Sequence, residues 1–506
     1  MTMRDSFAKY TDAETFARIV DYSCITEMWE HSVSTYAENV AIVDGRNYTY
    51  AELEEQVRTY RAVLAERGVQ AGDKVGIYMP NSVQFVKAFL AITTMGAAAV
   101  LLPPHLDAMT LLGCSMKFGL KAVVYAESHK EQLALLSEKN PTVATISADE
   151  TSDGILPAVT VDPSSLCAVL FTGGTTGRSK GARLSHRAVM AGTRNGCYCL
   201  DEVFEERYLL VLPLTHVFGL IRNLLTSLYT GSTLFICKNN KDMFRDIAGF
   251  RPTVLVLVPA LAEMALNLSR QFGRNMLGPD LKYIICGAAA VAPYLVTEYL
   301  KYGVRLLPGY GLTESANLVS GNPDAAIKPD SVGFIYPGMD YKIVDGELWL
   351  KGENMMDGYV GDEENSIAYS PDGYFKTGDL VRMDDEGFLY ITGRIKEIIV
   401  LSTGENVSPA ELESYFYAVD EVQDCMVCST VENGREILAV QIYPRAAMLK
   451  ARGITDAEAY FKERTAEINK RLPAFEQISR VVVRNTDFVR SPAMKIVRGK
   501  NGIDKS

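Results

Sequence analysis

The residues best suited to chemistry lie in one short loop, Phe171-Thr-Gly-Gly-Thr-Thr-Gly-Arg-Ser-Lys-Gly181. Glycines let backbone N–H groups approach a phosphate closely, threonine hydroxyls donate further hydrogen bonds, and a lysine supplies positive charge. This combination predicts a site for a nucleoside triphosphate, although a flexible surface turn has a similar composition. The loop is not a Walker A motif, because Lys180 is followed by Gly181 and not by Ser or Thr.

Three further motifs place polar side chains where a nucleotide could bind. Gly309-Tyr-Gly-Leu-Thr-Glu-Ser315 combines an aromatic ring, a hydroxyl and a carboxylate, which suit a base, a phosphate and a magnesium ion. Tyr374-x-x-Thr-Gly-Asp379 offers a carboxylate for ribose hydroxyls, and Gly393-Arg-Ile-Lys-Glu397 puts charge at an expected domain boundary. Each motif alone is also explained by an ordinary turn or a solvated linker. Their occurrence together, in this order, favours a nucleotide site.

Alternating helical and strand patterns surround these motifs. Short β-rich segments between longer helices predict βαβ units and mainly parallel sheets, so the expected fold class is α/β. Nucleotides in such folds bind beyond the carboxyl ends of strands, where the glycine-rich loop lies. An apolar segment, residues 166–171, enters this loop, and a helix is expected to leave it near Ser185. The expected helices are residues 50–68, 82–96, 185–199, 217–229, 261–270 and 292–301, and the expected strands are residues 74–79, 97–102, 208–212, 232–237, 253–258, 281–286 and 304–307.

The pattern changes after Gly303. Short strands with Gly/Asp turns at residues 346–351, 373–379 and 384–390 predict a small antiparallel or barrel-like unit. A compact α+β segment follows from Ile395, and 506 residues are more than one core usually organises, so two or more domains are expected. Residues 126–164 are polar and weakly patterned, and we expect a surface hairpin and a linker there.

Composition and charge limit the classes of function. A net charge of −11 and a pI of about 5.2 disfavour a general nucleic-acid binder. The N-terminus lacks the apolar core of a signal peptide. The apolar stretch from Phe89 to Leu102 is too short to span a bilayer, and it predicts a buried helix and strand. These features predict a cytoplasmic protein without an integral membrane segment.

The nine cysteines lie mostly in apolar segments, as Cys167, Cys237 and Cys286 do. Buried, reduced thiols are therefore expected. Cys425 and Cys428 have the C-x-x-C spacing, but no second pair or nearby histidines accompany them, so a plain strand is expected there.

Taken together, the ordered motifs from Phe171 to Lys495 resemble the adenylate-forming superfamily, which includes acyl- and aryl-CoA synthetases, peptide-synthetase adenylation domains and firefly luciferase. They are most similar to those of acyl- and aryl-CoA ligases. The resemblance implies an N-terminal ATP- and acid-binding domain, residues 1–394, with two parallel-type α/β subdomains and a small β-barrel-like unit. A mobile α+β C-terminal domain, residues 395–506, would be hinged to it.

The resemblance also implies the chemistry. Such enzymes join a carboxylic acid to ATP, release pyrophosphate and then pass the acyl group to a thiol, so ATP, Mg²⁺ and coenzyme A or phosphopantetheine are expected. The expected residues of the β/γ-phosphate loop are Thr172, Gly174, Thr175, Thr176, Gly177 and Lys180. The expected residues around adenine are Gly287, Ala288, Ala289, Tyr310 and Gly311. Thr313 would contact the α-phosphate, Glu314 would hold magnesium, and Asp379 and Arg394 would bind the ribose.

The C-terminal domain would contribute the remaining parts. Lys396 matches the hinge, and Lys495 matches the catalytic lysine that touches both the acid and the α-phosphate. Gly404 and Glu405 would lie by the tunnel through which the thiol arrives. Cations near the reacting phosphorus are expected to stabilise the charge that develops there.

The chain departs from the superfamily pattern at four places. Gly173 replaces a common serine, Ser179 replaces a common proline, and Gly287-Ala-Ala289 replaces Gly-Gly-Ala. Met494 precedes the C-terminal lysine where glycine is usual. Glycine allows a close backbone approach, so Met494 is expected to affect how that loop docks without abolishing adenylation.

The segment Leu212–Leu220 resembles the entrance of the acid pocket in acyl- and aryl-CoA ligases. His216 would lie near the carboxylate or adenylate, or would be a structural histidine. Phe218 and Gly219 stand where amino-acid-activating domains carry Phe-Asp, so α-amino acids are disfavoured. Arg222, one turn further, would pair with a polar or anionic group of the acid, or would be a helix-surface or structural arginine. The chain length leans toward aryl or short-to-medium acyl acids.

Three functions are compatible with these observations. The first is an ATP-dependent acid–CoA ligase acting on a small-molecule carboxylic acid. The second is a stand-alone adenylation enzyme that loads the phosphopantetheine of an acyl or peptidyl carrier protein. The third is a non-catalytic nucleotide or acid sensor, which the presence of Lys180, Glu314, Asp379, Arg394 and Lys495 disfavours.

Overall fold

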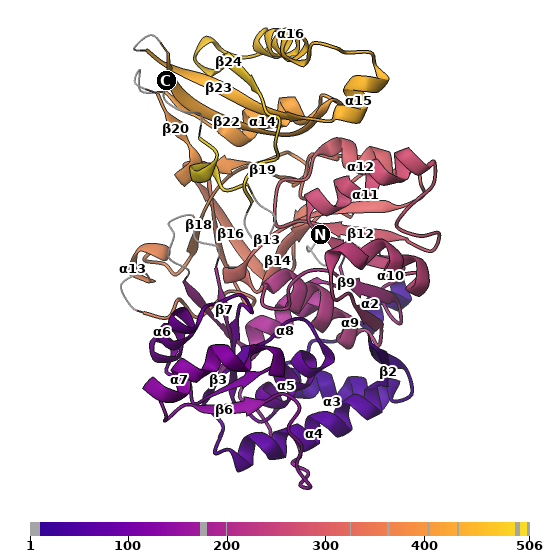
Figure 1. Cartoon of the computed structure of the whole chain (residues 1–506), viewed down its shortest axis with the longest axis vertical. Coiled ribbons are helices and arrows are strands. Elements are labelled where there is room, and N and C mark those ends of the chain that lie inside the picture. Colours follow the sequence, from indigo (N-terminus) through magenta and orange to yellow (C-terminus); the bar gives the residue numbers. More distant parts are fainter. Residues whose placement is uncertain are drawn as a thin grey trace.

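Two large sheets, a smaller antiparallel sheet and a C-terminal part make up the computed structural model of the chain (Figure 1). The structure describes residues 11–172, 180–198, 200–323, 325–361, 365–401, 405–432, 435–490 and 496–502.

The first large sheet has six strands in the order β6-β5-β3-β4-β7-β8, and its neighbours are parallel except β7 and β8. Its central strands are rich in Val, Ile and Leu and are buried on both faces, as a parallel sheet covered by helices requires. The strands are β3 Lys74–Tyr78, β4 Ala98–Leu102, β5 Ala122–Tyr125, β6 Ala144–Ser147, β7 Leu166–Phe171 and β8 Gly181–Ser185.

The second large sheet has nine strands in the order β15-β14-β13-β12-β11-β9-β10-β1-β2. Its strands are parallel from β13 to β1. The strands at the two edges pair in the antiparallel direction: β2 at one edge, and β14 and β15 at the other. The strands are β1 Val40–Asp44, β2 Arg46–Thr49, β9 Arg207–Leu210, β10 Thr233–Ile236, β11 Val254–Leu257, β12 Tyr283–Cys286, β13 Arg305–Leu312, β14 Asn317–Gly321 and β15 Phe334–Ile335.

Helices cover both sheets and fill the space between them. The helix α8 contacts β7 and β8 of the six-stranded sheet and β14 of the nine-stranded sheet, so it links the two layers. Side-chain caps fix several helix starts: Thr49 and Glu52 form a capping box, and Ser185 caps α8. The helices are α2 Ala13–Arg18, α3 Ile25–Tyr36, α4 Tyr50–Glu66, α5 Val83–Thr94, α6 Ala108–Phe118, α7 Ala134–Lys139, α8 His186–Asn195, α9 Thr226–Tyr229, α10 Met243–Phe250, α11 Pro259–Phe272 and α12 Pro293–Leu300, with a π-helix, η2, at Phe218–Leu225.

The third sheet is antiparallel and ends at Arg394. Its inner face packs on β14 and β15 through an apolar cluster that includes Val319, Ile335, Leu348 and Leu389. The strands are β16 Met339–Val344, β17 Glu347–Gly352, β18 Phe375–Met383 and β19 Leu389–Arg394, and the short helix α13, Asn365–Ala368, precedes β18.

Residues 399–502, here named the C-terminal part, form a separate layer at the top of Figure 1. The short 3₁₀ turn η5, Ile395–Glu397, connects it to β19. Its own apolar core packs three helices against a three-stranded sheet. The elements are β20 Ile399–Val400, β21 Asn406–Val407, α14 Pro409–Tyr417, β22 Val422–Glu432, β23 Arg435–Pro444, α15 Ala446–Ala451, α16 Ala457–Asn469 and β24 Ile478–Val483.

One buried polar cluster joins the C-terminal part to α11 and α12. Arg445, between β23 and α15, donates from Nε to Glu263 Oε1 at 2.9 Å, and its Nη2 donates to both Glu263 and the Tyr294 hydroxyl. Its Nη1 donates to Asp420 O at 2.7 Å. We name Arg445, Glu263 and Tyr294 the interface cluster. Burial raises the pKa of Glu263, and the Arg445 guanidinium offsets part of that rise.

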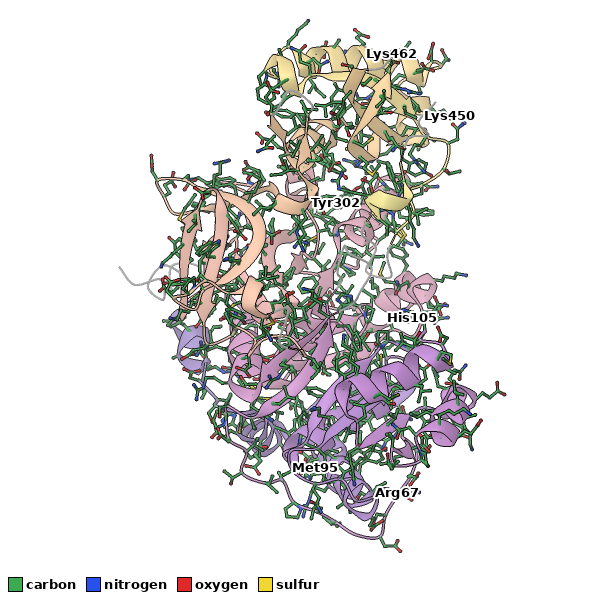
Figure 2. The ribbon with its side chains drawn as sticks, turned by 90° about the vertical axis from the view of Figure 1, so that its left-hand side faces the viewer. Arg67, Met95, His105, Tyr302, Lys450 and Lys462 are labelled. Atoms are coloured by element: carbon green, nitrogen blue, oxygen red, sulfur yellow. The ribbon has the colours of Figure 1, made fainter. Side chains whose placement is uncertain are left out.

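The molecule is elongated, with the C-terminal part at one end. Figure 2 shows Lys450 and Lys462 on that end and Arg67 and Met95 at the opposite end. Tyr302, which follows α12, lies between these two ends, below the C-terminal part.

The predicted α/β class is confirmed, and so are the predicted helices and strands of the parallel sheets to within a few residues. The expectation for residues 126–164 is wrong in part. Instead of a hairpin, the 3₁₀ helix η1, Glu127–Leu133, and α7 lead to β6, which joins the sheet parallel to β5. The apolar pattern there is sparse because β6 is an edge strand and contributes one fully buried residue, Ile146.

The described cysteines are all free thiols, and all but Cys428 are buried. Cys425 and Cys428 lie in β22, as the predicted strand requires. Burial raises the pKa of Cys197 to about 12 and that of Cys237 to about 11, and it also raises the pKa of Cys286. These thiols are therefore protonated at neutral pH.

Within the described ranges, no helix is both long enough and apolar enough to cross a membrane.

Candidate active site

The glycine-rich loop joins two antiparallel strands. Thr172 N donates to Lys180 O at 2.8 Å, which closes the loop directly after the last pair of β7 and β8. The helix expected near Ser185 is confirmed, because α8 begins at His186, but the sequence analysis did not predict β8, which lies between the loop and this helix. A Cβ on Gly181 would lie 2.7 Å from the Phe118 ring, so glycine is required where β8 packs. Four residues predicted to bind phosphate, Gly174, Thr175, Thr176 and Gly177, lie outside the described residues.

Tyr359 connects this loop to the predicted magnesium ligand, and sequence reasoning missed it. Its hydroxyl donates to Glu314 Oε1 at 2.6 Å, and Lys180 Nζ lies 4.8 Å from its ring centroid. Backbone bonds between residues 357–360 and β8 hold it there. The signal in the sequence is the flanking pair Gly358 and Gly361, both of which have positive φ.

The turn that carries Thr313 and Glu314 is built to be rigid. It forms the 3₁₀ helix η4, Thr313–Ser315, between the antiparallel strands β13 and β14. Met356 N donates to Glu314 O at 2.8 Å, and the buried Ser315 hydroxyl bonds within the turn. A Cβ on Gly311 would lie 2.0 Å from Asn317 O, so this glycine serves strand pairing.

Backbone strain is concentrated just after this turn. Ala316 has φ +47 and Asn317 has φ +109, both outside the usual range for residues with side chains. The backbone of α8 at Gly192 approaches so closely that a Cβ there would lie 1.9 Å from Ala316 O. Such strain persists only where the surroundings impose it, and it is typical of functional sites.

The predicted ribose-binding residues lie together. Asp379, on β18, accepts from Arg394 Nε at 2.5 Å and from the Tyr310 hydroxyl at 2.6 Å. We name these three residues the site cluster. Asp379 is buried, whereas the Arg394 side chain remains 40% exposed, so a ligand can reach the cluster from the Arg394 side. Burial and the Asp379 carboxylate raise the pKa of Tyr310 well above its usual value.

The predicted adenine wall follows β12. Gly287 is buried where a Cβ would lie 2.8 Å from Gly309 O and 3.5 Å from the Phe218 ring. Three segments distant in sequence therefore meet at this point. Ala288 and Ala289 are exposed, and Ala288 has φ +65, a conformation in which glycine is favoured. The departure from Gly-Gly-Ala thus places an alanine in the left-handed region.

The segment that leads into η2 is held by a residue that sequence reasoning missed. Asn81 donates to Leu212 O at 2.8 Å and accepts from Leu214 N at 2.9 Å, so it fixes the turn before His216. His216 is half-buried, and its carbonyl accepts from Leu220 N at 2.8 Å. A Cβ on Gly219 would lie 2.2 Å from Pro213 O, so this glycine permits close packing.

The predicted helix over residues 217–229 exists, but Phe218–Leu225 is a π-helix, a rare form that often marks functional sites. Phe218 contacts the Gly287 wall, and Arg222 follows four residues later. Arg222 is 1% exposed. The interpretation of Arg222 as a helix-surface residue is therefore wrong.

The residues predicted for the hinge and the thiol tunnel are only partly described. Lys396 is exposed in η5, beside Glu397, which pairs with Arg498 at 3.2 Å. Glu405 O accepts from Leu401 N at 2.9 Å. Gly404 and Lys495 lie outside the described residues.

The assembled residues suit a nucleotide bound with its phosphates near Lys180 and Glu314 and its sugar near Asp379. The described part of the chain has no group of three or more His, Cys, Asp or Glu side chains suited to a metal ion. A single carboxylate such as Glu314 fits Mg²⁺ that is shared with a triphosphate, because this ion keeps several waters and takes one or two protein carboxylates.

Comparisons with known proteins agree with this geometry. The family model described as AMP-binding enzyme matches residues 29–360, and the model described as AMP-binding enzyme C-terminal domain matches residues 396–501. The chain therefore belongs to the AMP-binding enzyme family, and the resemblance found in its sequence is confirmed.

Its relatives are acyl- and aryl-CoA ligases. Long-chain-fatty-acid–CoA ligase FadD13 of Mycobacterium tuberculosis is 30% identical over 405 residues, which cover 75% of this chain and 79% of the relative. Feruloyl-CoA synthase of Amycolatopsis sp is 28% identical over 398 residues, covering 76% and 80%. The crystal structure of anthranilate CoA ligase AuaEII with anthranoyl-AMP shares the fold, with a TM-score of 0.85, 20% identity and coverage of 95% and 97%. The protein is thus an enzyme of the AMP-forming acid–CoA ligase type.

Proposed function

We propose that the protein activates a carboxylic acid with ATP and transfers the acyl group to the thiol of coenzyme A. The proposal rests on the short distance in sequence, along β13 and η4, between two sets of polar side chains. The site cluster lies at Tyr310, and the Lys180–Tyr359–Glu314 contacts lie four residues later. A sugar and a triphosphate are joined covalently, so binding both requires such neighbouring groups.

In the first step, a carboxylate oxygen of the acid attacks the α-phosphorus of ATP, the bond to the β-phosphate oxygen breaks, and pyrophosphate leaves. Asp379 and Arg394 orient the ribose. The Lys180 ammonium stabilises the negative charge of the pyrophosphate as it leaves. Glu314, with Thr313 beside it, would hold Mg²⁺, and this ion would supply positive charge to the phosphate oxygens. Lys495 supplies a cation at the reacting centre, and its loss is expected to slow adenylation by about a hundredfold to a thousandfold.

In the second step, the thiol attacks the acyl carbonyl, and AMP leaves. We propose that a C-terminal domain, residues 395–506, rotates about Lys396 against residues 1–394, so that Gly404 and Glu405 come to line the thiol tunnel. The exposed position of Lys396 in a short 3₁₀ turn between two sheets supports a hinge at this point. His216, Phe218 and Gly219 form the entrance of the acid pocket, and aryl or short-to-medium acyl acids are favoured.

The test is pyrophosphate release with ATP and Mg²⁺ over aryl and acyl acids of increasing length, with the thioester identified by mass spectrometry. Acyl-CoA formation with one class of acid is the expected result. Pyrophosphate release that requires a holo carrier protein instead of CoA would identify the second candidate acceptor. A Lys495→Ala protein that makes adenylate at the wild-type rate would contradict the mechanism.

A further inference from the structure

Arg222 is a buried charge with two unsatisfied nitrogens, and no carboxylate among the described residues pairs with it. Its Nε and Nη1 atoms are buried and make no hydrogen bond with any described residue. An arginine side chain stays protonated in proteins, so it cannot relieve its burial by losing a proton. Burying a charge without compensation is costly, and proteins rarely retain such a residue for stability alone.

A second fully buried arginine shows what a structural role looks like in this chain. Arg61 is 0% exposed, and each of its nitrogens has a partner. Nε donates to Leu156 O at 2.9 Å, Nη1 to Thr94 Oγ1 at 2.7 Å and Nη2 to Glu54 Oε1 at 2.7 Å. The contrast indicates that the unsatisfied nitrogens of Arg222 bind an acceptor that comes from a ligand and not from the chain.

Arg222 lines a small cavity bordered by η2 and the strands β12, β13 and β14. The cavity measures about 10 Å³, the room that one water molecule needs. Its lining also includes Asn322, whose Nδ2 donates to Lys328 O and Ser331 O while its Oδ1 has no donor among the described residues. Burial raises the pKa of Tyr208 to about 12, and the adjacent Arg222 charge offsets part of that rise.

The cavity borders the proposed nucleotide site. Gly309 belongs to the cavity lining, and its carbonyl also borders the Gly287 wall that the Phe218 ring covers. Phe218 stands about one helical turn before Arg222 on the same π-helix. An acid whose reacting carboxylate lies near the nucleotide and whose far end passes Phe218 therefore ends at Arg222.

We propose that Arg222 binds a second carboxylate at the far end of the substrate, so that the preferred acids are dicarboxylic. This inference rests on the proposed function and specifies its substrate class. A guanidinium binds a carboxylate by two parallel hydrogen bonds, and in a buried site that pairing supplies the compensation that Arg222 lacks. A carboxylate oxygen that reaches Arg222 takes the place of the one water for which the cavity has room, and Asn322 Oδ1 accepts from a water or hydroxyl beside it.

The experiment compares acids matched in length, from butanoate and butanedioate to octanoate and octanedioate, by kcat/KM for pyrophosphate release. We expect the best dicarboxylate to exceed its monocarboxylate partner by about tenfold or more, and the ratio to fall by about a hundredfold in Arg222→Met. Arg222→Lys should keep part of the preference, because the charge remains but the paired hydrogen bonds do not.

Thermal unfolding of the same variants separates binding from structure. Arg61→Met should lower the unfolding temperature by several degrees, whereas Arg222→Met should leave it unchanged or raise it, because an uncompensated charge is removed. Destabilisation by Arg222→Met equal to that by Arg61→Met would overturn the inference. Turnover of monocarboxylates without any preference for dicarboxylates would also overturn it while leaving the proposed function intact. Failure of every acid to release pyrophosphate would overturn both.

Discussion

The site cluster and the interface cluster use the same three kinds of side chain for different ends. Tyr310, Asp379 and Arg394 lie where we propose that the nucleoside of ATP binds, and Tyr294, Glu263 and Arg445 join the C-terminal part to α11 and α12. The arginine of the first is 40% exposed, and that of the second is 4% exposed. An open cluster can exchange its internal bonds for bonds to a ligand. A sealed cluster can only stay closed or separate as a whole.

A buried histidine, His186, differs from both clusters because its ring has no hydrogen-bond partner among the described residues. It gives the largest expected effect, which is on the free energy of unfolding. His186, the first residue of α8, is fully buried, and neither ring nitrogen has a partner among the described residues. Burial lowers its pKa from 6.5 to about 4. Between these values the unfolded chain takes up a proton that the folded chain does not. The free energy of unfolding should therefore fall as the pH falls through this window, by about 3 kcal/mol for this residue.

The measurement is urea unfolding at pH 7 and pH 4.5 for the wild type and His186→Phe. Carboxylates elsewhere change both proteins alike, so the difference between the two pH profiles isolates His186. Parallel profiles would show that the buried ring does not carry the effect.

Breaking the open cluster should affect ATP use directly. Asp379→Asn removes the charge that pairs with Arg394 and would accept the ribose hydroxyls, and we expect kcat/KM for ATP to fall by about a hundredfold. Glu263→Gln makes the same chemical change in the interface cluster and should reduce kcat/KM for ATP far less. Pyrophosphate release at limiting ATP checks both. Equal losses would mean that the two clusters do not differ in function.

Breaking the sealed cluster should loosen the C-terminal part. Arg445→Met leaves Glu263 buried without its cation, and separation of the two parts relieves that cost. We expect tryptic cleavage near the exposed Lys396 to become about tenfold faster, which corresponds to about 1.4 kcal/mol. The double variant Glu263→Gln/Arg445→Met should recover part of the protection, because neither charge then remains.

Arg452→Met provides the matched control for proteolysis. Arg452 pairs with Asp420 and Glu421 within the C-terminal part, so its loss should leave cleavage near Lys396 unchanged. Faster cleavage in this control as well would attribute the effect to local destabilisation and not to the interface.

Much of the architecture could be predicted because local patterns and tertiary structure agree there. The apolar segments of β3, β4 and β12 and the capped starts of α4 and α8 carry their own signals. The segment 126–164 could not be predicted, because an edge strand and a short helix bury too few residues to show a period. The π-helical form of η2, where Gly219 packs closely on Pro213, has no signal in the sequence.

The site shows the same limit. Motif residues such as Asp379 and Glu314 were predicted from short sequence patterns. Tyr359 and Asn81 were missed because they act through partners far away in the sequence. The lack of a carboxylate partner for the buried Arg222 could not be inferred from the sequence, because it depends on the tertiary structure around η2.

The buried cysteines have a chemical consequence for an enzyme that makes an activated acyl group. Cys286 directly precedes the Gly287 wall, so a thiol of the protein itself lies next to the proposed adenine site. Its burial and raised pKa keep it protonated, and a protonated thiol is a poor nucleophile. In the proposed reaction this buried thiol therefore competes poorly with the incoming acceptor thiol for the activated acyl group.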